Sequence, residues 1–444
     1  MSLGFSRGTI LGIRKVMKKP IIKVNKQCYV CGFKSLTPIL SLGELHVSDF
    51  LEGDLSRRHR KLPLELVLCN KKGGGCGLLQ LKHTVSHELM YRRYWYRSGV
   101  NMTMRTELHG IVKTIESLLN FNDGDYVLDI GANDGTLLRA YLSKNIHRIG
   151  FEPARNLMRY AREGTTKIIN EFFNLLDWQR NLKGAKAKAI TAIAMFYDLE
   201  EPNKFVSHIV RCLDDNGVFI IQMAYLPSML SKNAFDNICH EHLQYYSLLS
   251  LEHLLARHNL EVFDVILNDI NGGSFRTYIQ HKGKGKLMKI SKGARERVEE
   301  LRKFEDELGL DEKKIYDGFV KRVSSLKERL TEFIKKETES GKKVYVYGAS
   351  TKGNTLLQFY NLDYRLIPKA VERNPDKWGR KTIGTEIPII SEEEARKNPP
   401  HYFLILPWHF LKEFKEREKE FLKSGGKFII PLPNFKIIGH VSQK

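Results

Sequence analysis

One short stretch, residues 125–138, constrains the fold more than any other part of the sequence. It reads DYVLDIGANDGTLL, so an apolar run ends at Asp129 and is followed by a loop with two glycines, Gly131 and Gly135. A helical pattern of apolar residues begins directly after Gly135. A strand, a glycine turn and a helix in this order are typical of an open parallel sheet, which binds small molecules at the carboxyl ends of its strands. We therefore predict an α/β fold.

The acidic side chains of this loop indicate the kind of ligand. A dinucleotide-binding Gly-x-Gly-x-x-Gly would need a glycine at Asn133. Instead, Asp129 and Asp134 flank the turn, which suits a cation better than two phosphates. After the first helix, RIGFEP reads as a second strand that ends in Glu152, a carboxylate placed to accept both hydroxyls of a ribose. The alternative is a glycine turn in another Rossmann-like sheet, with Glu152 merely solvated.

A cation that carries a ribose and an adenine is S-adenosylmethionine (SAM), and the two segments resemble motifs I and II of class I methyltransferases. Asp129 would then lie near the amine of the methionine. The predicted SAM-binding residues are Asp129, Gly131, Asn133, Gly135, Glu152 and Pro153.

Length and charge limit the class of protein. A chain of 444 residues is too long for one core and predicts two or three domains. No apolar run approaches the roughly 20 residues of a membrane span, and the basic start has no cleavage site, so we expect a cytoplasmic protein. The net charge of +21 permits a nucleic-acid partner. Because the lysines are spread over the whole length, the charge alone does not identify the partner.

Four of the six cysteines form two pairs near the N-terminus. Two residues separate Cys28 from Cys31, and six residues, NKKGGG, separate Cys69 from Cys76. Two such pairs predict a four-cysteine zinc site, since disulfides are rare in the cytosol. The alternative is a set of reduced core cysteines. Four thiolates would fill the coordination shell of Zn²⁺, so we expect its role to be structural.

Residues 91–99, YRRYWYRSG, form a cluster of aromatic and arginine side chains. Such a cluster can stack a base and clamp phosphates, or it can be a packing seam between domains. An amphipathic helix is predicted after it, over 102–119.

Residues 235–247, FDNICHEHLQYYS, concentrate groups that can move protons. Histidine accepts a proton near neutral pH, and a neighbouring carboxylate can orient it. A metal site fits the spacing less well, because His240 and His242 are two positions apart, whereas the metalloprotease helix needs four. A polar surface turn is the third alternative. We favour acid–base chemistry.

The order of the motifs resembles one known family. After CxxC come DIGANDG, GFEP, FDNI-x-x-EH, NGGSFR at 271–276 and YGASTKG at 347–353. From about Cys28 almost to the C-terminus, the chain resembles the three-domain SAM-dependent nucleotide-sugar C-methyltransferases that build branched deoxysugars. The resemblance implies an N-terminal zinc-binding domain, a central class I methyltransferase and a C-terminal Rossmann-like domain.

The resemblance also implies roles for individual residues. Glu241 and His242 match the Glu-His pair, in which the histidine is the proposed base, and Tyr94 and Tyr96 fall where the family has substrate-side tyrosines. The chain departs from the pattern at three places, with Cys239 in place of a tyrosine, His240 in place of an acid, and Tyr197 and Asp198 where a histidine is expected.

The implied chemistry is methylation at carbon. A carbon beside a carbonyl becomes a nucleophile only after its proton is removed, so His242, oriented by Glu241, would enolise a ketosugar. Phenols such as Tyr94 or Tyr245 would stabilise the enolate oxygen. The predicted substrate contacts are Tyr96, His240, Asn271, Gly273, Arg276 and Lys352.

The C-terminal third reads as a second Rossmann-like start. A charged stretch over 295–336 reads as a solvated connecting helix, and a strand, a glycine turn and a helix follow over 343–360. The turn lacks the dinucleotide fingerprint, so we expect this domain to pack over the site or to contact the ligand with its turn rather than to hold a cofactor. Trp408 and His409 are either ligand contacts or core residues. The expected segments are a basic extension over 1–26, a zinc-binding domain over 27–90, a methyltransferase domain over 91–285, a helical connector over 286–336 and a C-terminal domain over 337–444.

Three functions remain open from the sequence. The first is a C-methyltransferase of a nucleotide-linked ketosugar. The second is a methyltransferase that acts on oxygen or nitrogen of another sugar or nucleoside, which the departures at Cys239 and His240 keep open. The third is a nucleic-acid-binding protein with a zinc module, which the charge favours and the intact SAM motif opposes.

Overall fold

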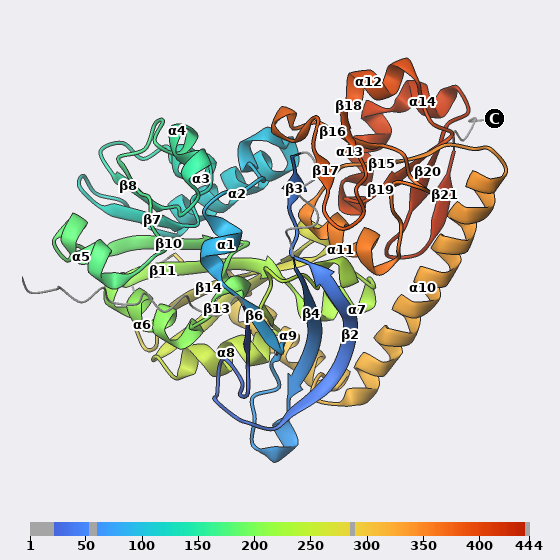
Figure 1. The fold of residues 1–444 in the computed structure, drawn as a ribbon. Helices are drawn as coiled ribbons and strands as arrows, with labels where there is room; N and C mark the ends of the chain where they lie inside the picture. The colour runs from blue at the N-terminus through green and yellow to red at the C-terminus, as the bar shows by residue number, and fades with distance from the viewer. Residues whose placement is uncertain (1–21, 53–59, 285–288, 440–444) are drawn as a thin grey trace, which may run out of the picture.

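The structure, a computed structural model, describes residues 22–52, 60–284 and 289–439. Figure 1 shows three parts, with a large sheet on the left, the N-terminal strands at the lower centre and a second large sheet at the upper right. Most of the predicted basic extension over 1–26 lies outside the described residues, and Ile22–Val24 forms strand β1. Within the described residues, no helix is both long and apolar enough to cross a bilayer.

The N-terminal part contains two small antiparallel sheets. One pairs β1 with β6, and the other has the order β12-β5-β4-β2. Strand β12 lies far along the chain, within the 235–247 segment that contains the predicted base, and pairs with β5. The base motif is therefore attached to the N-terminal part. The elements are β2 (Leu36–His46), β3 (Phe50–Leu51), β4 (Lys61–Cys69), β5 (Leu79–Leu81), β6 (His83–Val85), α1 (His87–Tyr91) and β12 (Gln244–Tyr245).

The central part is a seven-stranded sheet with the order β9-β8-β7-β10-β11-β14-β13. Strand β14 runs antiparallel to both of its neighbours, β11 and β13. If the seven strands are numbered 1 to 7 along the chain, their order across the sheet is 3-2-1-4-5-7-6. Dinucleotide-binding sheets have the order 3-2-1-4-5-6 instead. The elements are α2 (Met102–Leu118), β7 (Tyr126–Ile130), α3 (Thr136–Arg139), β8 (His147–Phe151), α4 (Met158–Ala161), β9 (Lys167–Ile169), α5 (Leu175–Leu182), β10 (Ala187–Ile193), α6 (Pro202–Cys212), β11 (Leu213–Ala224), α7 (Leu226–Ser231), α8 (Leu248–Ala256), β13 (Leu260–Asn268) and β14 (Ser274–His281).

The charged stretch over 295–336 is not a solvated helix. It forms two helices, α9 (Ala294–Leu308) and α10 (Lys313–Glu339), and α10 runs along the outer side of the C-terminal part (Figure 1). Apolar residues at helical spacing bury one face of α10, and only the opposite face carries the charges. The buried residues are Tyr316, Phe319, Val323, Leu326, Leu330 and Ile334.

The C-terminal part is a six-stranded sheet with the order β18-β16-β15-β19-β20-β21, in which only β21 is antiparallel to its neighbour. This order is that of a Rossmann sheet. The predicted boundary between 336 and 337 falls inside α10. The elements are β15 (Val344–Tyr347), α11 (Thr351–Phe359), β16 (Ala370–Glu372), β17 (Lys381–Thr382), β18 (Ile389–Ser391), α12 (Glu392–Lys397), β19 (Tyr402–Ile405), α13 (Leu411–Arg417), α14 (Lys419–Lys423), β20 (Lys427–Ile430) and β21 (Lys436–Ile438).

The three parts are joined by shared cores. One apolar cluster contains residues of β2 and β4, of the segment around Phe235, of α10 and of the C-terminal sheet. Strand β17 also pairs with β3 across the same junction. These contacts hold the central and C-terminal sheets against each other.

Candidate active site

Both large sheets direct the carboxyl ends of their strands toward one cavity of about 390 Å³. From the central sheet it is lined by Gly131 after β7, Glu152 after β8 and Met195 after β10. From the C-terminal sheet it is lined by Ser350 after β15 and Pro407 after β19. Ligands of open α/β sheets bind at such strand ends, where the strand order reverses. Here two of these positions face the same cavity.

Two buried carboxyl groups lie at the end of the cavity formed by the central sheet. Asp129 accepts a hydrogen bond from the hydroxyl of Thr191 at 2.6 Å. Glu152 accepts the backbone N–H groups of Asn133 at 2.7 Å and of Ala154 at 2.8 Å. Burial raises the pKa of each carboxyl group to about 7. A bound cation and ribose hydroxyls would favour their charged forms.

The glycine turn leaves room beside these carboxyl groups. Gly131 has φ of +73°, and a Cβ there would lie 3.2 Å from the side chain of Met195, another lining residue. Gly135 has φ of +78° and would meet the carbonyl of Ala161 at 2.8 Å, so it shapes the start of α3 without lining the cavity. The carboxyl groups and the open turn fit SAM.

The loop residues Asn133 and Asp134 hold the chain that precedes α2. Asn133 accepts the N–H of Ser98 and donates to the carbonyl of Tyr96, both at 3.0 Å, while Asp134 accepts the N–H of Gly99 at 2.8 Å. Asn133, Tyr96 and Ser98 line the cavity, whereas Asp134 does not. Asp134 therefore positions a loop over the site, and the sequence-based placement of its charge beside a cationic ligand is wrong.

The aromatic cluster over 91–99 divides between the cavity and the domain junction, and Arg92, Arg93 and Arg97 do not line the cavity. Tyr91 and Tyr94 line the cavity, and the hydroxyl of Tyr91 donates to the carbonyl of Glu241 at 3.1 Å. Trp95 instead faces the domain junction, where its indole N–H donates to Asp49 at 2.8 Å. The tyrosines belong to the site and the tryptophan to the seam.

His242 lies in the cavity as a neutral imidazole. Its Nδ1 is 2.7 Å from the carbonyl oxygen of Asn237. Because a carbonyl can only accept, Nδ1 carries the proton and Nε2 has the free lone pair. Burial and then the charge of Lys352 lower the pKa of His242 to about 3. The expected orientation of His242 by Glu241 is replaced by orientation through the backbone of Asn237.

Glu241 also lines the cavity, and burial raises its pKa to about 7. Cys239, Glu241 and His242 bring ligand atoms within 4.8 Å of one another, but Cys239 does not line the cavity. The metal site considered from the sequence would include both His240 and His242. His240 donates from Nε2 to the carbonyl of Leu62 at 3.2 Å and so points into the N-terminal sheet.

Five predicted site residues do not line the cavity: Gly135, His240, Tyr245, Gly273 and Arg276. Arg276 is paired with Glu107 and donates to Gln222 at 2.7 Å, which holds it within the central sheet. The other predicted substrate contacts, Tyr96, Asn271 and Lys352, do line the cavity, as does Pro153.

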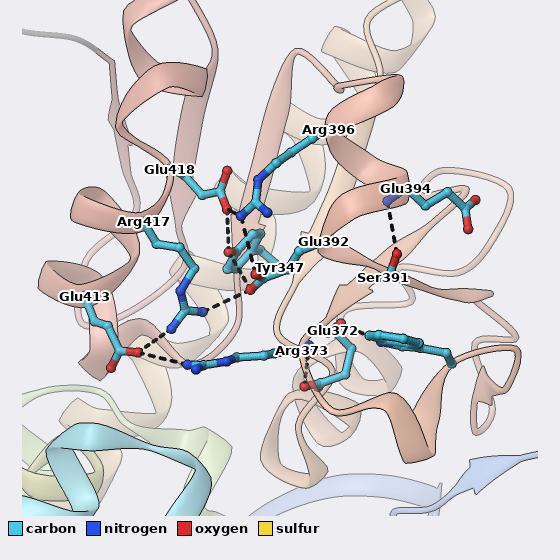
Figure 2. Close-up of polar contacts among 11 residues, drawn as sticks. Tyr347, Glu372, Arg373, Ser391, Glu392, Glu394, Arg396, Glu413, Arg417 and Glu418 are labelled. Atoms are coloured by element: carbon cyan, nitrogen blue, oxygen red, sulfur yellow. Dashed lines mark hydrogen bonds and ion pairs between the residues drawn. The ribbon is translucent and has the colours of Figure 1, made fainter.

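The C-terminal end of the cavity contains residues that the sequence did not single out. Arg373, directly after β16, and Arg417, at the end of α13, both line it. Figure 2 shows both guanidinium groups beside Glu413, with Arg417 also paired to Glu392 at 3.0 Å. Arg373 could have been found from its place at a predicted strand end, whereas Arg417 comes from a helix with no such signal.

His409, which follows β19, also lines the cavity. It is half-buried, and burial of its imidazole lowers its pKa to about 3. In the described part of the chain its Nδ1 has no hydrogen-bond partner. Of the two interpretations of this residue, the structure favours a ligand contact, because an unpaired polar atom faces a cavity.

The four N-terminal cysteines converge as a metal site requires. The Sγ atoms of Cys28 and Cys76 are 3.5 Å apart, as are those of Cys31 and Cys69. A tetrahedral zinc ion with bonds of about 2.3 Å needs sulfur atoms about 3.8 Å apart. A Cβ on Gly75 would lie 2.4 Å from the sulfur of Cys69, so the loop approaches that sulfur closely enough to require glycine. The residues fit a closed, structural Zn²⁺ site.

The sheet order and the carboxyl groups of this cavity define a class I SAM-dependent methyltransferase. Three family models match the chain in order, described as "Putative zinc binding domain" over 28–91, "Methyltransferase domain" over 103–265 and "C-methyltransferase C-terminal domain" over 269–433. Together the three matches give the chain a zinc-binding domain, a methyltransferase domain and a C-methyltransferase C-terminal domain, in this order.

A curated relative matches nearly the whole chain. The C-methyltransferase NovU of Streptomyces niveus is 28% identical over 421 residues, which cover 94% of this chain and 98% of the relative. Among solved structures, the magnesium protoporphyrin IX methyltransferase ChlM of Synechocystis PCC 6803 with bound SAM matches 40% of this chain and 79% of its own at 11% identity and a TM-score of 0.30. A SAM-dependent methyltransferase of Clostridium acetobutylicum matches 40% of this chain and 92% of its own at 15% identity and a TM-score of 0.31.

Proposed function

We propose that the chain transfers a methyl group from SAM to a carbon beside the carbonyl of a nucleotide-linked ketosugar, with His242 as the base. The observation that carries the proposal is the continuity of the cavity. It extends from the carboxyl groups of Asp129 and Glu152, past His242, to Arg373 and Arg417. In a nucleotide sugar the reacting ring is joined through a diphosphate to a nucleoside. The ring would lie at His242, and the diphosphate at Arg373 and Arg417.

The chemistry at the base follows from its tautomer. The free Nε2 of His242 can accept the proton of the carbon beside the carbonyl, while Nδ1 remains fixed to the carbonyl of Asn237. When bound, SAM supplies an electrophilic methyl group carried on a sulfonium. The enolised carbon is then the nucleophile, and the residues around it hold it in place and exclude water.

Glu241 is a second candidate for the base. Its pKa is raised to about 7, whereas that of His242 is lowered to about 3. A general base works best when its pKa lies near the working pH. By this criterion Glu241 is an alternative to His242 as the base. The two alternatives are distinguished by which of the two residues, when substituted alone, inactivates the enzyme.

Anion recognition at the C-terminal end supports the nucleotide part of the proposal. Arg373 and Arg417 present guanidinium groups, which bind phosphate oxygens in pairs. Phe410 and Phe414 line the same region and offer apolar surface to the nucleobase of a nucleotide sugar. NovU is described as a C-methyltransferase, which agrees with carbon as the acceptor.

The test is transfer of radiolabelled methyl from SAM to a panel of 4-keto-6-deoxyhexoses linked to TDP, UDP, GDP or CDP. We expect one nucleotide sugar to accept the label. His242→Asn keeps a donor for the carbonyl of Asn237 but removes the base, so it should bind SAM normally and lose transfer. If Glu241→Gln instead abolishes transfer and His242→Asn retains it, Glu241 is the base. No labelled product from any member of the panel would refute the ketosugar substrate.

A further inference from the structure

Lys352 differs from the other cations of the cavity because no carboxylate of the described residues forms an ion pair with it. Three Lys or Arg side chains line the described cavity, and two of them, Arg373 and Arg417, are ion-paired with glutamates. Among the described residues, no carboxylate oxygen lies within 4.0 Å of the ammonium of Lys352. Its charge acts on the carboxyl groups of Glu241, Asp198 and Asp236, where it counteracts the rise in pKa that burial causes, so Lys352 supplies positive potential to this part of the cavity.

The position of Lys352 in the fold adds to this potential. It lies in the first turn of α11, directly after the turn that follows β15. Ser350 caps this helix by accepting the N–H of Gly353 at 2.9 Å. The amino end of a helix carries partial positive charge, so the backbone favours an anion at the place to which Lys352 brings its ammonium group.

One residue, Asn237, connects Lys352 to the predicted base. Its side-chain oxygen accepts a hydrogen bond from Nζ of Lys352 at 2.5 Å, and its backbone carbonyl accepts Nδ1 of His242 at 2.7 Å. Asn237 is buried, with 3% of its surface exposed. The ammonium and the imidazole are thus held by the same residue, and both face the cavity.

We propose that Lys352 is a catalytic residue that stabilises the enolate oxygen of the substrate, and that Asn237 is the positioning residue that aligns Lys352 with the base. The inference depends on the proposed enolisation of a ketosugar. The base takes the proton of the carbon beside the carbonyl, the C–H electron pair forms a C=C bond, and the carbonyl π pair moves to the oxygen. The ammonium donates a hydrogen bond to that oxygen, and the carbonyl forms again when the carbon takes the methyl group.

Lys352 suits this role better than the phenols that the sequence suggested. Tyr245 lies off the cavity, and its hydroxyl donates to the carbonyl of Asn237 at 3.3 Å. Tyr94 lines the cavity but lies near Glu241 and Asp198, and burial together with these carboxyl groups raises its pKa well above the usual value. It can donate a neutral hydrogen bond, whereas Lys352 supplies a full positive charge.

The test is incorporation of deuterium from D₂O into the ketosugar, with S-adenosylhomocysteine in place of SAM so that no methyl group is transferred. The panel of 4-keto-6-deoxyhexose nucleotides supplies the probe, and NMR follows the protons on both carbons beside the carbonyl. We expect exchange by the wild type and a loss of about 100- to 1,000-fold in Lys352→Met, the effect of removing one oxyanion donor. Lys352→Arg should recover part of the rate, and Lys321→Met, at an exposed position of α10, should exchange like the wild type.

Each outcome separates the two proposals. No exchange by the wild type with any member of the panel would refute the enolisation, and exchange by Lys352→Met at the wild-type rate would refute only the role of Lys352. A change confined to KM, with kcat retained, would make Lys352 a binding residue and also overturn the inference. SAM affinity, measured for each variant, verifies that the central sheet is folded.

The role of Asn237 is tested by a double-mutant cycle. Asn237→Ala keeps the backbone carbonyl that holds His242 but removes the acceptor for Lys352. It should lower kcat for exchange, and in the Lys352→Met background it should have no further effect, since the two residues act as a unit. Additive losses would contradict positioning through Lys352.

Discussion

Replacement of Glu152 by glutamine tests the SAM-binding end of the cavity. The two oxygens of Glu152 accept backbone N–H groups from Asn133 at 2.7 Å and Ala154 at 2.8 Å. Glutamine keeps the shape, but it loses the charge and turns an amide N–H₂ toward one of these donors. Hydrogen bonds to a charged group contribute about 1.5–3 kcal/mol each. At the lower end of this range, losing the bonds from both ribose hydroxyls of SAM to Glu152 weakens binding by about 3 kcal/mol. Since about 1.4 kcal/mol is a factor of ten, we expect SAM affinity to fall about 100-fold.

Calorimetric titration of SAM into purified wild type and Glu152→Gln measures this change. The matched control is Glu163→Gln, which removes one carboxylate from an exposed position in the same sheet region. Circular dichroism verifies that all three proteins are folded. A Kd for Glu152→Gln within threefold of the wild-type value would refute the assignment of Glu152 to the ribose.

Three further predictions concern pH, metal and stability. The pKa values of Asp129 and Glu152 are raised to about 7, so both groups become protonated at lower pH. SAM affinity should therefore fall from pH 8 to pH 6, and proton release on binding should appear as a buffer-dependent enthalpy. A constant Kd would contradict this. Elemental analysis should find one zinc per chain, lost in Cys69→Ser and retained in Cys212→Ser, and retention in both would refute the four-cysteine site. Glu305→Ala removes the acceptor of two N–H groups in the first turn of α8 and should lower the free energy of unfolding by about 3 kcal/mol in urea, whereas a change below 1 kcal/mol would contradict this role.

The local elements of the SAM site could be predicted from the sequence. The strand, glycine turn and helix around Gly131 are encoded in fourteen consecutive residues, 125–138. The structure has the strand over Tyr126–Ile130 and the helix from Thr136, although the helix ends at Arg139, earlier than the apolar pattern suggested. Short-range patterns of this kind depend on backbone preference and periodicity alone.

The base end of the cavity could not be predicted in the same way. The pairing of β12 with β5 joins positions about 165 residues apart, and the hydrogen bond between Lys352 and Asn237 spans 115. Neither partner carries a local signal for the other, so the sequence assigned the orientation of His242 to its neighbour Glu241. The buried stripe of α10 is a different case, since its apolar spacing was readable and the high charge of the stretch obscured it.

The measurement that tests the account most directly is the position of the new methyl group. SAM with a ¹³C-labelled methyl group would be turned over with the accepted nucleotide sugar, and the product examined by two-dimensional NMR. The account predicts a methyl carbon at high field, coupled to a ring carbon beside the carbonyl. A methyl signal in the range of a methoxy or N-methyl group would contradict it and identify an oxygen or nitrogen acceptor.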